Sequence, residues 1–390
     1  MRNSFLVLLL VTSALFQAAC SKPSGSPVPG SWQTDLYRDL ISGKRIAIVA
    51  NQTSMVGKRH LVDTLKRSGI DIRAIFAPEH GFRDMADAGD HIDDGIDAST
   101  GIPVISIYGS HFKPSPDDLE GIDVVLFDIQ DVGARFYTYI STLHYVMEAC
   151  AENGVECIVL DRPNPNGFYV DGNIPDTAYR SFVGMHPVPV VHGMTIGEYA
   201  RMINGEGWLG GGKKCRLTVI SCLNYDHHTF YELPVKPSPN LPNQNSVYLY
   251  PSICFFEGTN LSLGRGTSFP FQVYGSPDLP DTGFSFTPES ISGAKNPPLL
   301  GRLCYGTDLR NALTDGIVPS PELNLGWLID AYNRYPDKNK FFTPYFDVLA
   351  GGPVLREQIQ KGMSASRIRE TWEPGLENFA LIRNKYLLYE

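Results

Sequence analysis

The sequence has no surplus of basic residues and no long block of charge of either sign. Its 390 residues include 33 Lys and Arg against 42 Asp and Glu, giving a formal net charge of −9 and a pI near 5.5. Nucleic-acid binders need basic patches to neutralise phosphates, so this balance argues against a nucleic-acid partner. Hydrophobic residues make up 43% of the chain, which is enough for a substantial core. At this length it favours two domains over one.

Several short motifs for cofactors and catalysis are also absent. No GxGxxG follows the first predicted strand, where VANQTS stands at residues 49–54, so a dinucleotide cofactor is not expected. HExxH, Cys-rich metal spacings and GxSxG are missing, which counts against a zinc hydrolase and a standard serine hydrolase. GWLGGGKK (207–214) resembles a P-loop, but Lys214 stands where a Ser or Thr must reach the metal. We therefore expect neither a cofactor nor a bound metal.

Cysteine is scarce, with seven residues and no CxxC pair. Six lie in the body of the chain and are interpreted as small buried thiols, although export would permit disulfides. They are Cys150, Cys157, Cys215, Cys222, Cys254 and Cys304.

The seventh cysteine, Cys20, follows an apolar N-terminal run. Arg2 and the stretch FLVLLLVTSALF (5–16) predict a secretory signal that is too short to span a bilayer comfortably. Ala18-Ala19-Cys20 resembles the end of a bacterial lipobox, although Gln17 departs from the usual Leu. A Ser/Pro/Gly-rich tether follows, so residues 1–30 are excluded from the fold. We expect an exported lipoprotein of the cell envelope, periplasmic or membrane-anchored through a lipid on Cys20, with plain secretion as the alternative.

Short β-branched runs alternate with helical stretches from residue 44 onward. Continuous apolar runs suit strands buried on both faces, and their spacing leaves room for crossover helices. An α/β domain with a parallel sheet and helices on both sides is therefore predicted for residues 31–230. The expected strands are 45–51, 71–79, 102–109, 123–131, 156–164 and 217–222.

The helices and the second domain are predicted from periodicity and composition. Residues 135–153 have apolar side chains at intervals of three and four, and residues 195–207 begin with a capping box formed by Thr195 and Glu198. Pro- and aromatic-rich segments after residue 230 favour ordered loops and short strands. A smaller α+β domain is predicted for 245–390, with helices near 322–335 and 353–362 and a strand near 379–388.

Polar residues end the predicted strands. In an open parallel sheet, ligands bind outside the carboxyl ends of the strands, so these residues mark a candidate cleft. Each one by itself is also explained as a satisfied turn residue or a helix cap. They are Asn51, Glu79, His80, Tyr108, Asp128, Gln130, Asp131, Asp161 and Arg162.

Further candidates lie in other motifs. Arg135 and Tyr137 follow Asp131 at a strand-to-helix junction, where a helix N-terminus favours anions, and Asp131 could equally be the helix cap. His186 and His192 flank a short extended run, with a core or loop role as the default. Glu257 follows Phe255 and Phe256, where burial would suit a proton donor, although an exposed turn explains it equally. Arg265 lies in the same motif, FEGTNLSLGRGT.

An ordered set of motifs then resembles one family. FAPEHGF, TGIPVISIYG, FDIQDVGARFYTYISTL, DRPNPNG, VGMHPVPVVHGMTIGEYA, PSPNLPN and FEGTNLSLGRGT follow one another in this order. The chain is similar to the NamZ family of bacterial exo-β-N-acetylmuramidases from about residue 44 to its end. The resemblance implies a Rossmann-like domain, a smaller auxiliary domain and a cleft between them. It also implies release of terminal β-1,4-linked N-acetylmuramic acid from the non-reducing end of peptidoglycan fragments.

The resemblance matches Glu79 to the family's proposed catalytic glutamate. Glycoside hydrolysis usually needs a protonated carboxyl and a second carboxylate, so Glu79 is predicted to be the acid. His80 could orient or recharge it or be structural, and Asp128, Asp131 and Glu257 remain open as the second carboxylate. Arg135 and Arg265 are predicted to bind the lactyl carboxylate of muramic acid. The remaining substrate-binding candidates are Asn51, Gln130, Tyr137, Arg162 and His192.

Two alternatives stay open at this point. A non-catalytic lipoprotein that binds muropeptides or sugars would need the same signal, tether and cleft. A metal-dependent hydrolase using the histidines is the weaker alternative.

Overall fold

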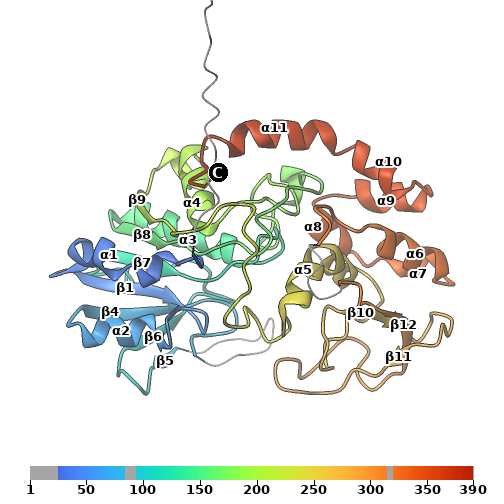
Figure 1. Ribbon diagram of the computed structural model, residues 1–390, viewed down its shortest axis with the longest axis horizontal. Helices are drawn as coiled ribbons and strands as arrows, with labels where there is room; N and C mark the ends of the chain where they lie inside the picture. Colours follow the sequence, from blue (N-terminus) through green and yellow to red (C-terminus); the bar gives the residue numbers. More distant parts are fainter. Residues whose placement is uncertain (1–24, 84–93, 314–318, 390) are drawn as a thin grey trace, which may run out of the picture.

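A seven-stranded sheet forms the centre of the larger domain. The structure is a computed structural model that describes residues 25–83, 94–313 and 319–389 (Figure 1). All neighbouring strands pair in parallel except β5, which is antiparallel to β6. The sheet order is β5 (Gly95–Ile96), β6 (Pro103–Ser106), β4 (Asp71–Ala77), β1 (Arg45–Ala50), β7 (Val124–Asp128), β8 (Glu156–Leu160) and β9 (Arg216–Ile220).

Helices cover both faces of this sheet, as predicted. Successive side chains of a strand such as β1 point into the apolar clusters on the two faces, so both faces must be covered. In β1, Ile46 and Ile48 belong to the apolar cluster under α1 and α2, whereas Ala47 and Val49 belong to the cluster under α3 and α4. Successive strand side chains point to opposite faces, so a strand buried on both faces must be apolar throughout. The helices are α1 (Thr34–Ile41), α2 (Leu61–Arg67), α3 (Tyr139–Asn153) and α4 (Ile196–Gly205).

Local signals fix the helix ends on this sheet. Thr195 and Glu198 form the predicted capping box at the start of α4, and Gly154 ends α3 with a φ of 68°, which glycine adopts without steric cost. α3 begins four residues later than predicted, at Tyr139, because residues 135–138 form turns. This shift decides where Arg135 lies. A short hairpin, β2 (Met55–Val56) and β3 (Arg59–His60), and 3₁₀ turns at Gly30–Trp32, Thr177–Tyr179 and Gly210–Gly212 complete the domain.

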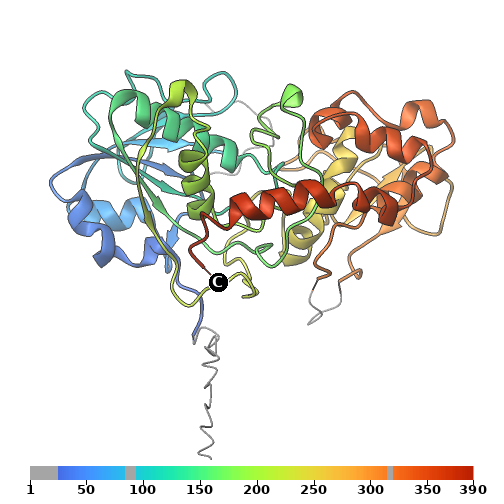
Figure 2. The ribbon, with the colours of Figure 1, turned by 90° about the horizontal axis from the view of Figure 1, so that it is seen from above.

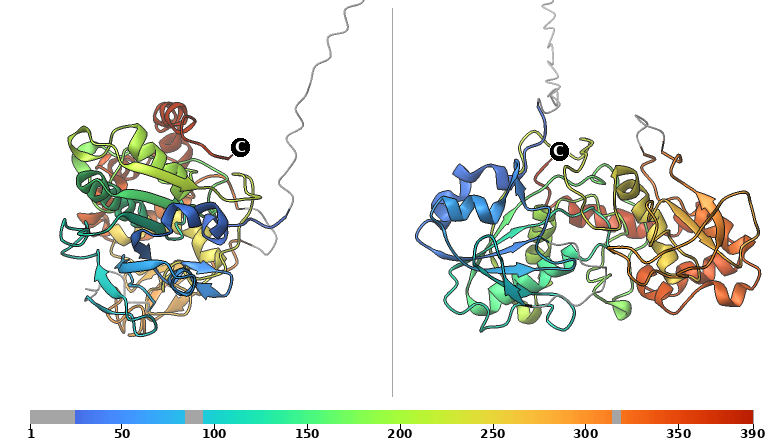
Figure 3. Two further views of the ribbon diagram at one scale, coloured as in Figure 1. Left: turned by 90° about the vertical axis from the view of Figure 1, so that its left-hand side faces the viewer. Right: turned by 90° about the horizontal axis from the view of Figure 1, so that it is seen from below.

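The second domain combines short helices with a small antiparallel sheet in the order β10–β12–β11. The two domains lie side by side in Figure 1 and in the right-hand view of Figure 3. Its elements are α5 (Gln244–Ile253), the 3₁₀ helix η4 (Cys254–Gly258), β10 (Val273–Ser276), β11 (Ser285–Phe286), β12 (Cys304–Asp308), α6 (Gly326–Arg334), α7 (Lys338–Phe341), α8 (Tyr345–Ala350), α9 (Val354–Gln360) and α10 (Ala365–Glu370).

Two predictions for this region are wrong. Residues 244–253 form α5 rather than a loop, despite Pro251, because Asn243 caps the helix through a capping box with Ser246. The strand predicted near 379–388 is absent: residues 379–383 belong to the helix α11 (Glu373–Arg383), and residues 384–388 form turns and irregular structure. This helix runs from the second domain back to the sheet domain (Figure 2). There the buried Tyr389 donates its hydroxyl hydrogen to Asp161 at 2.6 Å.

Residues 1–30 were predicted to lie outside the fold, but Val28 exchanges backbone hydrogen bonds with Leu223, and Pro29 and Gly30 are buried. The other sequence predictions about the N-terminus, including Cys20, lie outside the described residues. Among the described residues, no helix is both long and apolar enough to cross a membrane.

Candidate active site

A pocket with a volume of about 280 Å³ opens where the two domains meet. Its lining comes from the carboxyl end of β4, the segment before α3, the segment 238–241, and the region from α5 to α8. Aromatic rings dominate the wall, and two glutamates and one arginine supply charge. The lining residues are Glu79, His80, Tyr108, Phe136, Tyr137, Thr138, Tyr139, Phe182, Val183, Ser238, Leu241, Tyr250, Glu257, Arg265, Phe271 and Tyr345.

Glu79 stands two residues beyond the end of β4, and two hydroxyl groups hold its carboxylate. Tyr108, two residues beyond β6, donates to Oε1 at 2.9 Å, and Thr138 donates to Oε2 at 2.6 Å. Since β4 and β6 are neighbouring parallel strands, their ends bring Glu79 and Tyr108 together. These two hydrogen bonds fix the position of the Glu79 side chain.

His80 also lines the pocket, with a backbone φ of 71° in the left-handed region that non-glycine residues seldom adopt. Gly81 follows with a φ of 87°, and its N–H donates to the carbonyl of Pro78 at 3.0 Å. The chain therefore reverses sharply directly after the strand. Such strained positions concentrate at functional sites, and here the reversal turns Glu79 and His80 into the pocket.

A second carboxylate reaches the pocket from the other domain. Glu257 lies in η4, and its Oε1 accepts both Nε and Nη2 of Arg265, at 2.9 and 2.5 Å. Both side chains remain partly accessible, at 24% and 20%. Oε2 of Glu257 has only a weak contact with Sγ of Cys254, at 4.0 Å, among the described residues. The charge of Glu257 raises the pKa of Arg265, whereas burial acts to lower it.

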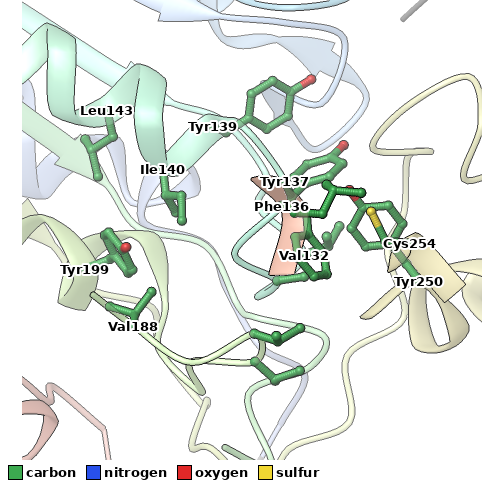
Figure 4. Packing of buried hydrophobic residues seen from close by; sticks show 14 of the residues in the cluster. Val132, Phe136, Tyr137, Tyr139, Ile140, Leu143, Val188, Tyr199, Tyr250 and Cys254 are labelled. Carbon is green, nitrogen blue, oxygen red and sulfur yellow. The ribbon is translucent and has the colours of Figure 1, made fainter. Parts of the chain in front are cut away.

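The aromatic side chains join the two domains beneath the pocket. Phe136 and Tyr137 of the sheet domain lie against Tyr250 and Cys254 of the second domain (Figure 4). The rings of Tyr137 and Tyr250 are 5.7 Å apart in an edge-to-face arrangement. Tyr137 also donates its hydroxyl hydrogen to the carbonyl of Pro237 at 2.7 Å. An apolar wall with a few directed polar groups is typical of a small-molecule site.

Asn51 supports this pocket from behind rather than lining it. Its Nδ2 donates to the hydroxyl of Tyr139 at 2.9 Å, and that hydroxyl donates to the backbone carbonyl of Glu79 at 3.4 Å. Asn51 is fully buried. The structure therefore places it one contact away from the pocket, where it orients Tyr139.

Asp128 and Arg162 form a buried ion pair away from the pocket. Nε and Nη2 of Arg162 donate to the two Asp128 oxygens at 2.7 and 2.9 Å, and the side chains are 3% and 0% exposed. Arg162 also donates to the Ser31 hydroxyl at 3.2 Å. Neither residue lines the pocket, so this geometry gives them a structural role in place of the predicted catalytic and binding ones.

Asp131, Gln130 and His192 are also buried outside the pocket lining. Oδ2 of Asp131 accepts the Gly133 N–H at 2.6 Å, and burial raises the pKa of Asp131 to about 7. Gln130 donates to the carbonyls of Asp131 and Pro163. Nε2 of His192 lies 3.9 Å from Asp131, and burial lowers the pKa of His192 to about 3. Gln130 and Asp131 were predicted to lie at a strand end, but their side chains, like that of His192, are buried in the protein and do not line the pocket.

Arg135 is enclosed and does not reach the pocket. Its Nη1 donates to the carbonyls of Asn173 and Val188 at 2.6 and 3.0 Å, and Nη2 donates to that of Leu349 at 3.1 Å. Burial lowers its pKa to about 9. Because α3 begins at Tyr139, no helix N-terminus lies at Arg135. The guanidinium instead joins the two domains through backbone carbonyls.

Sequence reasoning missed six polar residues of the pocket lining, namely Tyr108, Thr138, Tyr139, Ser238, Tyr250 and Tyr345. Tyr108 was recognised as a strand end but was not assigned to the site, and Thr138 lies inside a motif from which only its neighbours were chosen. Thr138 directly precedes α3, so a correct prediction that this helix starts at Tyr139 would have drawn attention to it. Tyr345 begins α8, far along the chain, and no local pattern marks it. In the described parts of the chain, no group of three or more His, Cys, Asp or Glu side chains is placed to hold a metal ion.

Comparisons with known proteins agree along nearly the whole chain. Residues 46–245 match the model for the N-terminal part of the exo-β-N-acetylmuramidase NamZ, and residues 248–389 match the model for its C-terminal part. The chain is 39% identical over 372 residues to the peptidoglycan β-N-acetylmuramidase NamZ of Bacillus subtilis (strain 168), covering 90% of this chain and 89% of that protein.

Two crystal structures of DUF1343 family proteins from Bacteroides fragilis NCTC 9343 are similar in fold. One has 48% identity and a TM-score of 0.87, covering 94% of this chain and 99% of that one. The other has 28% identity and a TM-score of 0.79, covering 93% and 99%.

Proposed function

The chain belongs to the NamZ family of exo-β-N-acetylmuramidases, and from this premise we propose that its interdomain pocket performs the hydrolysis. The substrate is the terminal β-1,4-linked N-acetylmuramic acid at the non-reducing end of a peptidoglycan fragment. One observation carries the proposal: Glu79 from the sheet domain and Glu257 from the second domain line the same pocket. Two carboxyl groups facing one sugar ring are what most glycosidases use.

Glu79 acts as the general acid in this proposal. It gives its proton to the glycosidic oxygen as the bond breaks, and the hydroxyls of Tyr108 and Thr138 then donate to the carboxylate that remains. A hydroxyl can also turn and accept, so both can follow Glu79 through its protonated and ionised states. His80, in the same pocket, is suited to returning the proton.

Glu257 acts as the second carboxylate. Arg265 occupies Oε1 with two charge-assisted hydrogen bonds, which leaves Oε2 available to the sugar or to a water. Carboxyl groups about 5–5.5 Å apart act with a nucleophile and retain configuration, and groups about 6.5–9.5 Å apart leave room for a water and invert it. NMR of the first-formed anomer of the released sugar identifies which of these mechanisms operates.

The lactyl carboxylate of muramic acid distinguishes it from N-acetylglucosamine. Arg265 remains our choice for binding it, because its Nη1 has no hydrogen bond to a described residue and the guanidinium lines the pocket. Arg135 is not proposed again, since its guanidinium is used by carbonyls.

The test is turnover of a chromogenic β-N-acetylmuraminide by the purified protein. General acid catalysis contributes on the order of 10²–10⁴-fold, so Glu79→Gln and Glu257→Gln should each lower kcat by about this factor. Glu377→Gln, on the exposed face of α11, is the matched control and should be unchanged. Activity that vanishes with a chelator would contradict the mechanism, as would full activity of Glu79→Gln. Sugar binding without turnover would instead indicate the binding lipoprotein.

We also propose that the protein is exported and anchored through a lipid on Cys20. The support is the sequence of residues 2–20, which lies outside the described residues. Cys20→Ala should move the protein from the membrane fraction to the soluble fraction of its host. An unlipidated mass for the mature wild type would contradict the anchor.

A further inference from the structure

The hydrogen-bond donors that line the pocket divide between the two domains. On the sheet-domain side, the hydroxyls of Tyr108 and Thr138 donate to the Glu79 carboxylate, and those of Tyr137 and Tyr139 donate to backbone carbonyls. These donors are already used within the protein. On the side of the second domain, the Tyr345 hydroxyl makes no hydrogen bond to a described residue, and its side chain is 41% exposed. It is therefore accessible to a ligand.

Close packing of α8 against η4 places Tyr345 beside Glu257. The N–H of Thr343 donates to the carbonyl of Gly258 at 2.9 Å. A Cβ on Gly258 would lie only 2.4 Å from Cα of Phe346, so this approach of the two backbones requires glycine. Phe346 itself is fully buried and packs edge-to-face on Phe342, with ring centroids 4.4 Å apart. Tyr345 thus extends into the pocket from a rigid base.

The charges around Tyr345 keep it a hydrogen-bond donor. Burial, followed by the negative charges of Glu257 and Glu79, raises the pKa of Tyr345 well above its ordinary value, while Arg265 acts weakly in the opposite direction. The phenol therefore stays neutral over the working pH range. It also lies within the electrostatic reach of Tyr108, which raises the pKa of that residue in turn. Tyr345 lines the same pocket as Glu79 and Glu257.

Arg265 alone is a weakened receptor for an anion. Two of its donor groups already bind Oε1 of Glu257, whose charge offsets that of the guanidinium. A second donor that carries no negative partner would complete a site for a carboxylate. Hydrogen bonds to charged acceptors are stronger than those between neutral groups. Tyr345 is accessible, makes no hydrogen bond to a described residue and lines the same pocket as this ion pair.

We propose that the Tyr345 hydroxyl, together with Nη1 of Arg265, binds the lactyl carboxylate and determines selectivity for muramic acid over N-acetylglucosamine. This inference rests on the proposed function, because it names a recognition group of the same pocket. In this proposal, Glu79 of the sheet domain supplies the acid, and Tyr345 and Arg265 of the second domain bind the ether-linked carboxylate.

The experiment removes only the hydroxyl, with Tyr345→Phe. We measure kcat/KM on chromogenic β-N-acetylmuraminide and β-N-acetylglucosaminide, and the affinity of N-acetylmuramic acid and N-acetylglucosamine by calorimetry. Loss of one hydrogen bond to a charged group should lower the preference for the muramic sugar by about 10-fold or more. Values for the glucosamine sugar should change little. Tyr305→Phe, in β12 and outside the pocket lining, is the matched control.

Each outcome decides the matter. A preference for muramic acid that is unchanged in Tyr345→Phe overturns the proposal, as does an equal fall for both sugars, which would assign the phenol to catalysis. If the wild type hydrolyses neither substrate, hydrolysis by this pocket is refuted, and the calorimetry alone decides the role of Tyr345. A selective loss of muramic acid affinity then supports it, and no selective loss overturns it.

Discussion

The buried pair of Asp128 and Arg162 provides a sharp test of structural against catalytic roles. Asp128→Asn keeps the shape of the side chain but leaves the Arg162 guanidinium unpaired at 3% exposure. Breaking a buried ion pair by removing one partner costs about 3–5 kcal/mol, whereas replacing both partners by apolar residues is often neutral or stabilising. Asp128→Asn should therefore destabilise the sheet domain strongly, and the double variant Asp128→Leu with Arg162→Met should recover most of the loss.

The assay is urea unfolding followed by circular dichroism, with kcat measured on the fraction that stays folded. A loss of this size is a large part of a typical total stability of about 5–15 kcal/mol. Asp123→Asn is the matched control, because the Arg45 guanidinium donates two similar hydrogen bonds to Asp123 on the surface, at 2.8 and 3.1 Å, beside one from the Arg45 backbone N–H. Its unfolding midpoint should barely move. If Asp128→Asn keeps its midpoint but loses kcat, Asp128 is catalytic and the structural reasoning is refuted.

Three further predictions concern stability and packing. Burial lowers the pKa of His144 to about 4. Since the unfolded residue titrates near 6.5, the contribution of neutral His144 to the free energy of unfolding is fully present above pH 6.5 and is lost as the pH falls toward 4. At pH 5 this loss is about 2 kcal/mol relative to His144→Gln, and a stability difference that is independent of pH would contradict it. Gly258→Ala should lower both the melting temperature and muramic acid affinity, because its Cβ displaces α8; wild-type values of both would show that the backbones can separate. The six cysteines in the described chain are free and buried, so a thiol reagent should react with them only after unfolding, and rapid labelling of the native protein would contradict this.

The sheet was predictable because its signal is local and repeated. The central strands β1, β7 and β8 are almost entirely buried apolar runs, and such runs separated by crossover lengths favour a parallel sheet covered on both faces. The two-residue strand β5 is exposed and was not predicted. The second domain lacked that regularity. Residues 379–388 were predicted as a strand, but the N–H groups of Leu388 and Tyr389 donate to the Glu198 carboxylate instead of to a neighbouring strand.

The site was predictable only in part, for a related reason. A strand end fixes where a residue lies but not which way its side chain turns. Glu79 turns into the pocket because His80 and Gly81 adopt left-handed backbone conformations, whereas Asp128 turns toward Arg162. Tyr345 required knowledge of a contact between α8 and η4, which no local pattern records.

Because both domains line the pocket, the contacts that hold the domains together also bear on the proposed reaction. Glu79 and Glu257 belong to different domains, so their separation, which sets the stereochemical course, depends on how the domains are held. Three features hold them: the rings of Tyr137 and Tyr250, the Arg135 guanidinium on carbonyls of both domains, and α11, which returns the chain to the sheet domain (Figure 2). In the proposed mechanism Arg135, which was predicted to bind substrate, acts only indirectly, because its guanidinium binds backbone carbonyls of both domains and does not line the pocket.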